Sequence, residues 1–409
     1  MSVIEVKKRS KCRICGEHNL LNLFSLKDMP LADGFKKVSS IENEFLYDID
    51  IYQCQKCNTV QTLHDISYKD YYSDYAYTVG ESKMASNFMK KLAETTFKKY
   101  SLKNGCKVIE IGSADGSQLL CFKNLGAKVF GFEPSEELCS VSRNIGVPVY
   151  EGLFELNSES DIPKEYKNAE VVLLTYTFDH IPEPIQFLEA VKRILDTETG
   201  LLIIEVHDLD KILERTEFCL FEHEHTVYMS LDTLKNALEL VGFKIISTEL
   251  LAEHDRRGNS LMIVATDRQN TKYNNDGIEI YNNDVYDLTK HLNFKNKLYR
   301  SIEKLDEFVM KNVKLGKKIA GYGAGGRGIM TLATMKSANN LQYLCDNNTS
   351  FQGFVTPKTH IPIVAPTDIA INPVDILLVF SYGYIDEIRD QLKEIKSENL
   401  EIISLLDLL

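Results

Sequence analysis

Two carboxylates and two imidazoles stand in one run of four residues, in the stretch FEHEHTVY at Glu222, His223, Glu224 and His225. Side chains of these types can bind zinc, transfer protons or form a polar turn. A neutral imidazole, with a pKa of about 6.5, suits a general base, and a neighbouring carboxylate can fix its tautomer. If the run is extended, the glutamates share one face and the histidines the other, so a Glu–His225 contact requires a turn.

Four of the nine cysteines form two Cys-x-x-Cys pairs, CRIC at Cys12 and Cys15 and CQKC at Cys54 and Cys57. Two tight turns can aim four thiolates at one ion and complete the tetrahedral shell of a structural zinc. A redox pair is the weaker interpretation, because one pair would suffice and neither lies in a βαβ unit. The sequence therefore predicts a structural Zn²⁺. The other five cysteines are expected to be buried small side chains: Cys106, Cys121, Cys139, Cys219 and Cys345.

A glycine-rich loop follows a buried strand in CKVIEIGSADGSQLLCF. The strand is expected over 107–111, and the small residues from Gly112 to Gly116 let a ligand approach the backbone beside a helix N-terminus. Glu133 ends the next expected strand, where doubly wound sheets take ribose hydroxyls. The loop is not Gly-x-Gly-x-x-Gly, and Asp115 would repel a pyrophosphate but tolerates a sulfonium. S-adenosylmethionine is therefore favoured over a dinucleotide.

Strand and helix patterns alternate after this loop and end in two apolar runs, FKIISTELL and SLMIVAT. This alternation predicts a mainly parallel sheet with helices on both faces and a late hairpin. A second glycine-rich loop, Gly321 to Gly326 in GYGAGGRG, lies between an expected strand and an expected helix. Taken alone it fits a dinucleotide fingerprint, so an NAD-dependent oxidoreductase is the alternative from another class. A phosphate at this helix N-terminus, with Arg327 as charge partner, is also physically sensible.

Taken in order, these motifs resemble the sugar C-methyltransferases of deoxysugar pathways, such as the enzymes for mycarose and tetronitrose. The resemblance covers nearly the whole chain through CRIC, PLADGF, CQKC, YYSDYAY, VIEIGSADG, GFEPS, FDHIPEP, HEH, RGNSLMIVA, GYGAGGRG and THIPIV. The expected fold class is α/β, in three parts. These are a zinc-binding module over 1–70, a class I methyltransferase Rossmann-like core over 71–270 and a Rossmann-like substrate-binding domain over 271–409.

The resemblance implies methylation of a nucleotide-linked 4-ketosugar at the carbon beside the ketone. A base removes the acidified proton, and the enolate attacks the sulfonium methyl. The resemblance makes His225 the base, with Glu222, Glu224 and His180 as further catalytic residues, whereas His223 and His207 are expected to be structural. The implied cofactor contacts are Tyr77, Glu110, Gly112, Ser113, Asp115, Gly116, Glu133, Thr177 and Phe178. The implied substrate contacts are Tyr75, Asn259, Tyr322, Arg327, His360 and Tyr382.

Two places depart from the family pattern. Glu222 stands where the family usually has a tyrosine. The phenol of a tyrosine can donate a hydrogen bond to the enolate, whereas an ionised carboxylate would repel it. EVHDL, with His207 and Asp208, replaces a more apolar EVPYL-like run. Either Glu222 is protonated or turned away, or the acceptor differs. Methyl transfer to a sugar oxygen or nitrogen therefore stays open, as does a sugar-nucleotide binding protein without catalysis.

Length and charge limit the remaining possibilities. A chain of 409 residues predicts two or three domains. Its net charge of −12 argues against a nucleic-acid partner and favours a small molecule. Its apolar runs are too short to cross a membrane, and MSVIEVKKRSKC lacks the apolar stretch of a signal peptide, so a cytoplasmic monomer or small homo-oligomer is expected.

Overall fold

The chain forms two compact units, each assembled from three segments. The structure is a computed structural model that describes residues 4–37, 44–67, 83–253, 256, 259–273, 288–393, 395 and 400–409. Unit 1 contains Met1–Leu20, Cys54–Leu209 and Thr226–Asp284, and unit 2 contains Leu21–Gln53, Asp210–His225 and Val285–Leu409. The linear division at residues 70 and 270 stays a prediction.

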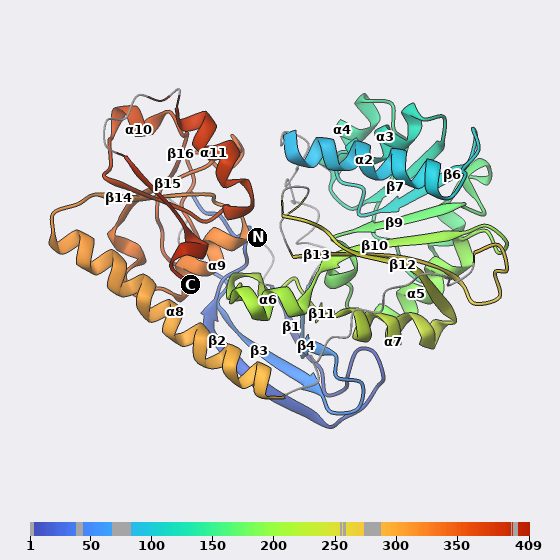
Figure 1. Ribbon diagram of the computed structural model, residues 1–409, viewed down its shortest axis with the longest axis horizontal. Coiled ribbons are helices and arrows are strands. Elements are labelled where there is room, and N and C mark those ends of the chain that lie inside the picture. Colours follow the sequence, from blue (N-terminus) through green and yellow to red (C-terminus); the bar gives the residue numbers. More distant parts are fainter. Residues whose placement is uncertain are drawn as a thin grey trace. The chain divides into compact units, whose positions relative to one another are not determined.

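A seven-stranded sheet forms the centre of unit 1, in the order β12-β13-β10-β9-β6-β7-β8 (Figure 1). The five strands from β6 to β10 run parallel, and β13 and β12 form the late hairpin expected from the sequence. The strand order reverses between β6 and β9, and ligands of such sheets bind outside the carboxyl ends of the strands at this point. The strands are β6 (Lys107–Ile111), β7 (Lys128–Glu133), β8 (Val149–Glu151), β9 (Val171–Thr175), β10 (Leu201–His207), β12 (Phe243–Leu250) and β13 (Ser260–Asp267).

Helices cover both faces of this sheet because its side chains alternate between two apolar cores. Val108 and Val129 pack into the core on one face, whereas Ile109 and Phe130, one residue further along each strand, pack into the core on the other. Figure 1 shows helices along both faces of the sheet. They are α2 (Lys83–Lys99), α3 (Ser117–Asn124) and α4 (Glu136–Asn144), and then α5 (Pro184–Ile194) and α7 (Leu231–Val241).

Short antiparallel pairs complete the described part of unit 1. Strand β1 (Val6–Lys8) pairs with β5 (His64–Ile66), and β4 (Val60–Thr62) pairs with β11 (Val227–Tyr228). The buried Arg13 ties this region together, since its guanidinium donates to the carbonyl oxygens of residues 62 and 64. The same group lies 2.7 Å from a carboxylate oxygen of residue 65. These bonds hold the first Cys-x-x-Cys turn in place.

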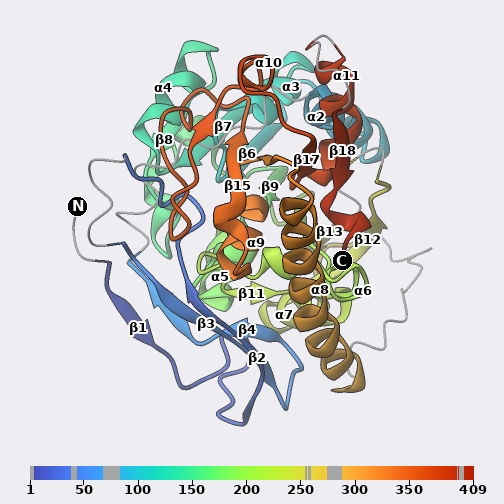
Figure 2. The same cartoon turned by 90° about the vertical axis from the view of Figure 1, so that its left-hand side faces the viewer.

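Unit 2 is built on a five-stranded parallel sheet in the order β16-β15-β14-β17-β18. The long helix α8 (Leu288–Lys314) belongs to this unit (Figure 2). Phe24, in β2 (Leu20–Met29), has its ring centroid 4.9 Å from that of Phe221 and 5.2 Å from that of Phe294 in α8. These contacts bring three distant segments into one core. The other elements are β3 (Tyr47–Cys54), α6 (Leu209–Arg215), β14 (Ile319–Tyr322), α9 (Gly326–Thr334), β15 (Leu341–Cys345), β16 (Ile363–Val364), α10 (Asp368–Ile371), β17 (Ile376–Val379), α11 (Ile385–Leu392) and β18 (Glu401–Ser404).

Among the described helices, none has the length and apolarity that a membrane-spanning segment requires.

Candidate functional site

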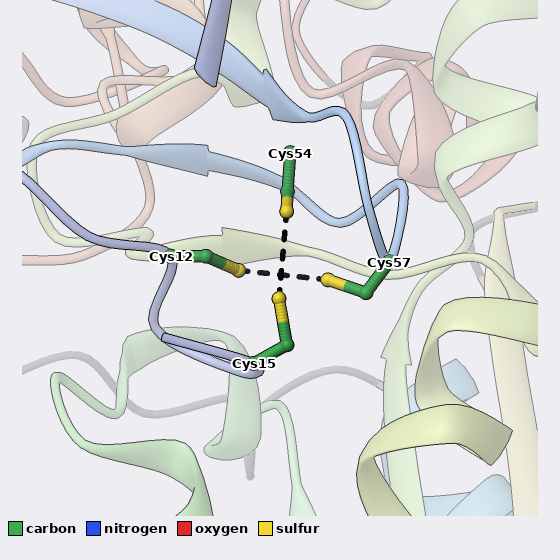
Figure 3. Close-up of side chains that lie close together, drawn as sticks. All are labelled: Cys12, Cys15, Cys54 and Cys57. Atoms are coloured by element: carbon green, nitrogen blue, oxygen red, sulfur yellow. Dashed lines mark hydrogen bonds between the residues drawn. The ribbon is translucent and has the colours of Figure 1, made fainter. Parts of the chain in front are cut away.

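The four paired cysteines converge on one point in unit 1, as predicted (Figure 3). Their sulfur atoms all lie within 4.8 Å of one another, and the Cys12–Cys57 and Cys15–Cys54 sulfur distances are both 3.5 Å. A tetrahedral zinc site with Zn–S bonds of about 2.3 Å has sulfur–sulfur distances of about 3.8 Å. The four thiols therefore fit Zn²⁺ closely.

Donors around the cysteines are placed to stabilise thiolates. The backbone amides of Ile14 and Lys56 donate to the sulfur atoms of Cys12 and Cys54, each at 3.4 Å. The side-chain amide of Gln61 adds a third hydrogen bond, to the Cys12 sulfur at 3.2 Å. Such outer contacts orient the ligands of a metal site and raise its affinity. With four sulfur ligands the coordination shell is complete, so this zinc is structural.

The cofactor loop predicted in unit 1 lies between β6 and α3, at the switch point of the sheet. Gly112 and Gly116 have φ values of 74° and 79°, in the left-handed region that favours glycine. A Cβ atom on Gly112 would lie only 2.5 Å from the hydroxyl oxygen of Thr177, which itself donates to the Ile111 carbonyl. The loop and the turn after β9 are therefore in close contact, and Ser113 is buried between them and Gly131.

Gly112→Ala is expected to weaken S-adenosylhomocysteine binding by about tenfold, because the new methyl group displaces Thr177 from the loop. Gly105→Ala is the matched control. Gly105 also has a positive φ, 83°, but nothing lies within 4 Å of its Cβ position. Both variants should lose about 1 kcal/mol of stability through backbone strain. Calorimetric titration should show weaker binding for Gly112→Ala alone, and equal binding by both variants would contradict the assigned contact.

Three acidic side chains predicted to contact the cofactor lie on or beside this loop. Glu133, at the end of β7, accepts hydrogen bonds from the amides of Ala114 and Ser135, both at 2.9 Å. Asp115 accepts from the amide of residue 117 at the start of α3. Glu110 is buried within β6 and accepts from the hydroxyl of residue 175. Burial raises the pKa of Glu110 to about 8 and that of Glu133 to about 7. A cationic ligand suits such a site, because it relieves the cost of ionising these carboxyl groups.

Glu110→Gln is expected to change the pH dependence of stability. The pKa of Glu110 is about 8 in the folded protein but about 4.3 in an unfolded chain. Between about pH 4.3 and about pH 8 the carboxyl group of Glu110 is therefore protonated in the folded protein and ionised in the unfolded chain. Wild-type stability should therefore fall as the pH rises from about 4.3 to about 8. Glutamine does not ionise, so above pH 8 the variant should be more stable by on the order of 5 kcal/mol. Urea unfolding across this range measures the effect, and parallel curves for the two proteins would contradict it.

The turn after β9 carries further predicted site residues, in η4 (Phe178–His180). Phe178 is fully buried, and His180 is held in the turn by its amide, which donates to the Thr177 carbonyl at 3.1 Å. Sequence reasoning missed Asp179 in the same turn, whose carboxylate lies 3.1 Å from Nδ1 of His207 at the end of β10. The only signal for this pair was the unusual EVHDL segment, because its two members are 28 residues apart.

The Glu-His-Glu-His run bends rather than extending as a strand, and regular pairing begins only at Val227. In unit 2, His223 Nε2 lies 2.9 Å from the carbonyl of Met29, and Glu224 accepts from the amide of Ala32 at 3.3 Å. His225 is buried, and its Nδ1 lies 2.7 Å from the carbonyl of Leu220. A carbonyl oxygen only accepts, so Nδ1 carries the proton in the neutral ring and Nε2 has the basic lone pair.

Glu222, where the family usually has tyrosine, is directed at the start of α9 in unit 2. A Cβ atom on Gly326 would lie 2.3 Å from one of its carboxylate oxygens. A carboxylate is stabilised at a helix N-terminus, where the peptide dipoles leave partial positive charge. This placement explains how the second glycine-rich loop accommodates the acid.

Glu222→Gln is expected to destabilise unit 2 by about 0.5–1 kcal/mol at low ionic strength, because the helix dipole loses its countercharge. Added salt should shrink the difference. Glu189→Gln, on the exposed face of α5, is the control and should be close to neutral at both salt concentrations. Denaturant unfolding measures the effect, and a penalty that does not depend on salt would argue against the dipole interaction.

The second glycine-rich loop is surrounded by internal contacts within unit 2. Asp346 accepts from the amide of Ala324 at 2.6 Å. Arg327 donates to the hydroxyl of Tyr382 at 2.9 Å, and that hydroxyl donates to the buried Glu217 at 2.5 Å. Burial raises the pKa of Tyr382 well above its usual value. Arg327 and Tyr382 thus form part of a buried polar network that joins α9 to the 210–225 segment.

The other described residues that are predicted to contact the substrate each have a partner within their own unit. Tyr322 is buried, and its hydroxyl donates to Gln391 at 2.7 Å. His360 Nε2 lies 2.9 Å from a carboxylate oxygen of Glu44 in the same unit. Asn259 belongs to unit 1, where its carbonyl accepts from residue 208 at 2.6 Å. Tyr75 and Tyr77 lie outside the described residues, so their roles stay predictions.

Three family profiles together span most of the chain. A zinc binding domain matches residues 12–72, a methyltransferase domain matches 82–248, and a C-methyltransferase C-terminal domain matches 256–406. The C-methyltransferase NovU of Streptomyces niveus is 26% identical over 396 residues, which cover 95% of this chain and 93% of the relative.

Similar solved structures include two that are described as methyltransferases. A S-adenosylmethionine-dependent methyltransferase of Thermotoga maritima, described as a possible histamine N-methyltransferase, is 21% identical, with a TM-score of 0.34 over 45% of this chain and 89% of its own. The magnesium protoporphyrin IX methyltransferase of Synechocystis with bound S-adenosylmethionine is 14% identical, with a TM-score of 0.37 over 49% of this chain and 94% of its own.

Proposed function

Because the chain belongs to the C-methyltransferases that join a zinc binding domain, a methyltransferase domain and a C-methyltransferase C-terminal domain, we propose that its acceptor is a nucleotide-linked keto-deoxy sugar. Transfer of a methyl group from S-adenosylmethionine to carbon is the activity of this family. The sugar acceptor is supported by the joint order of the motifs from CRIC to THIPIV along the sequence.

A ketone supplies what methylation at carbon requires, since it acidifies the neighbouring C–H bond. S-adenosylmethionine provides an electrophilic methyl group when bound. We assign the removal of the proton to Nε2 of His225, and the observation that carries this assignment is the 2.7 Å contact between its Nδ1 and the Leu220 carbonyl. This contact selects the tautomer with a basic Nε2 before the reaction and stabilises the imidazolium afterwards.

The competing functions have less support. The second glycine-rich loop lies inside residues 256–406, which match a C-methyltransferase domain, so an NAD-dependent oxidoreductase is not proposed. Methyl transfer to oxygen or nitrogen would suit Glu222 as a base, but its carboxylate lies against Gly326 at the start of α9. We therefore propose methylation at carbon with His225 as the base.

Product analysis tests this proposal directly. The zinc-loaded protein is incubated with S-adenosylmethionine and nucleoside-diphosphate 4-keto-6-deoxyhexoses that carry thymine, uracil or guanine. We expect one added CH₂ unit by mass, and NMR should place the new methyl group on the carbon beside the ketone. A methoxy or N-methyl signal would replace the proposal with one of its alternatives. No product from any of the ketosugars would argue against this acceptor class.

A further inference from the structure

A buried aspartate–histidine pair lies at the carboxyl edge of the seven-stranded sheet and has no role in the chemistry assigned so far. His207 is the last residue of β10, and its Nδ1 lies 3.1 Å from Oδ2 of Asp179 in the turn after β9. The two residues are only 8% and 4% exposed. Burying two ionisable groups costs free energy that an apolar pair would not, and such pairs cluster at functional sites.

The surroundings hold the imidazole of His207 in a fixed orientation. Its ring centroid lies 4.6 Å from that of Tyr176, whose hydroxyl is hydrogen-bonded to Ser260. The guanidinium of Arg256 lies 5.1 Å from the centre of the Tyr176 ring and pairs with Glu205 at 2.8 Å. Tyr176 has a φ of 52°, a left-handed conformation that costs a non-glycine residue about 1 kcal/mol or more. Strain of this kind, held by surrounding contacts, often accompanies functional sites.

The pair also stands next to the loop that is expected to bind the methyl donor. Thr177, two residues before Asp179, is the residue that a Cβ atom on Gly112 would strike. The carboxyl ends of β6, β9 and β10 therefore place the donor loop, the Asp179 turn and His207 along one edge of the sheet. An acceptor has to approach this edge, since its reacting carbon must come within about 3–3.5 Å of the methyl group.

We propose that His207, as an imidazolium paired with Asp179, donates a hydrogen bond to the ketone oxygen of the acceptor as the enolate forms. Asp179 accepts from Nδ1, which stabilises the positive charge, and Nε2 is then the nitrogen that meets the oxygen. This inference rests on the proposed function. A tyrosine at position 222 could donate this hydrogen bond to the enolate oxygen, but this chain has Glu222, whose carboxylate lies against Gly326. The inference assigns the same task to His207 and Asp179.

The step balances without another reactant. The base takes the proton from carbon, the C–H electron pair forms the C=C bond, and the ketone π pair moves to the oxygen. His207 keeps its proton and stabilises the oxyanion. The C=C pair then bonds to the methyl carbon while the S–C bond breaks, the ketone is restored, and S-adenosylhomocysteine leaves. His207 is thus a catalytic residue, and Asp179 is a positioning residue that acts through it.

The test compares His207→Phe, His207→Gln and Asp179→Asn, with a 4-keto-6-deoxyhexose nucleotide that the wild type methylates. Phenylalanine keeps the ring packing on Tyr176 but cannot donate. We expect kcat to fall about 100-fold for His207→Phe and about tenfold for His207→Gln, whose amide can still donate a neutral hydrogen bond, and for Asp179→Asn, with little change in KM. Exchange of the acceptor α-proton in D₂O with bound S-adenosylhomocysteine should fall by the same factors. S-adenosylhomocysteine affinity should stay at the wild-type value.

Wild-type kcat and exchange in His207→Phe would overturn the inference and leave the proposed function intact. Loss of S-adenosylhomocysteine binding in all three variants, in proportion to the loss of kcat, would assign the pair a structural role and would also overturn it. A wild type that methylates none of the ketosugars would overturn the proposed function, and this inference with it.

Discussion

Cys54→Ser is expected to abolish zinc binding and to lower the free energy of unfolding by at least about 3 kcal/mol. Cys54 is fully buried, and its sulfur is one of four that lie within 4.8 Å of one another. The binding free energy of a structural zinc is folding free energy, on the order of 10 kcal/mol, and removing one ligand forfeits much of it. Cys12 and Ile14 belong to the apolar core beneath α5 and α7, so losing the metal also disturbs that core. Metal analysis and urea unfolding measure both effects.

Cys345→Ser is the matched control, because Cys345 is equally buried but lies in β15 of unit 2. It should retain one zinc per chain. Its free energy of unfolding should fall only by the smaller amount expected when a polar atom is placed in a core. Full zinc content in Cys54→Ser would refute the four-cysteine site. A disulfide in the untreated protein, detected by thiol titration under non-reducing conditions, would instead favour the redox interpretation of the two pairs.

The main sheet of unit 1 could be predicted because its signals are local. Buried runs such as Val171–Thr175 alternate with amphipathic helical patterns, and two apolar runs close together predicted the β12–β13 hairpin. The assignment of the 210–225 segment to unit 2 could not be predicted. It depends on contacts such as that between Phe24 and Phe221, whose partners are far apart in the sequence and carry no local marker.

The candidate site also has residues that could be predicted from the sequence and residues that could not. The four cysteines and the Gly112–Gly116 loop could be found because their spacing alone specifies a geometry. Asp179 was missed because an aspartate before His180 looks like an ordinary turn residue, and its partner His207 belongs to another strand. The direction of the Glu222 side chain also could not be predicted, since Gly326, which it faces, comes about a hundred residues later in the chain.

His225→Ala is expected to lower kcat by about 100- to 10,000-fold, the range for loss of a general base. Its Nδ1 contact with the Leu220 carbonyl gives the neutral ring a basic Nε2, which alanine cannot replace. Alanine removes the base without changing the predicted methyl donor loop between β6 and α3, so S-adenosylhomocysteine affinity should not change. Steady-state kinetics with a methylated ketosugar nucleotide, together with calorimetric titration of S-adenosylhomocysteine, measures both quantities.

His223→Ala separates proton transfer from support of the same segment. His223 is also buried, and its Nε2 contact with the Met29 carbonyl anchors the run, so its loss should lower stability while much of kcat is retained. Exchange of the acceptor α-proton in D₂O gives the sharper comparison, because it reports deprotonation without methyl transfer. Exchange should vanish in His225→Ala and persist in His223→Ala. If His225→Ala exchanges at the wild-type rate, the base is another residue, and the tautomer fixed by Leu220 serves only to hold the turn.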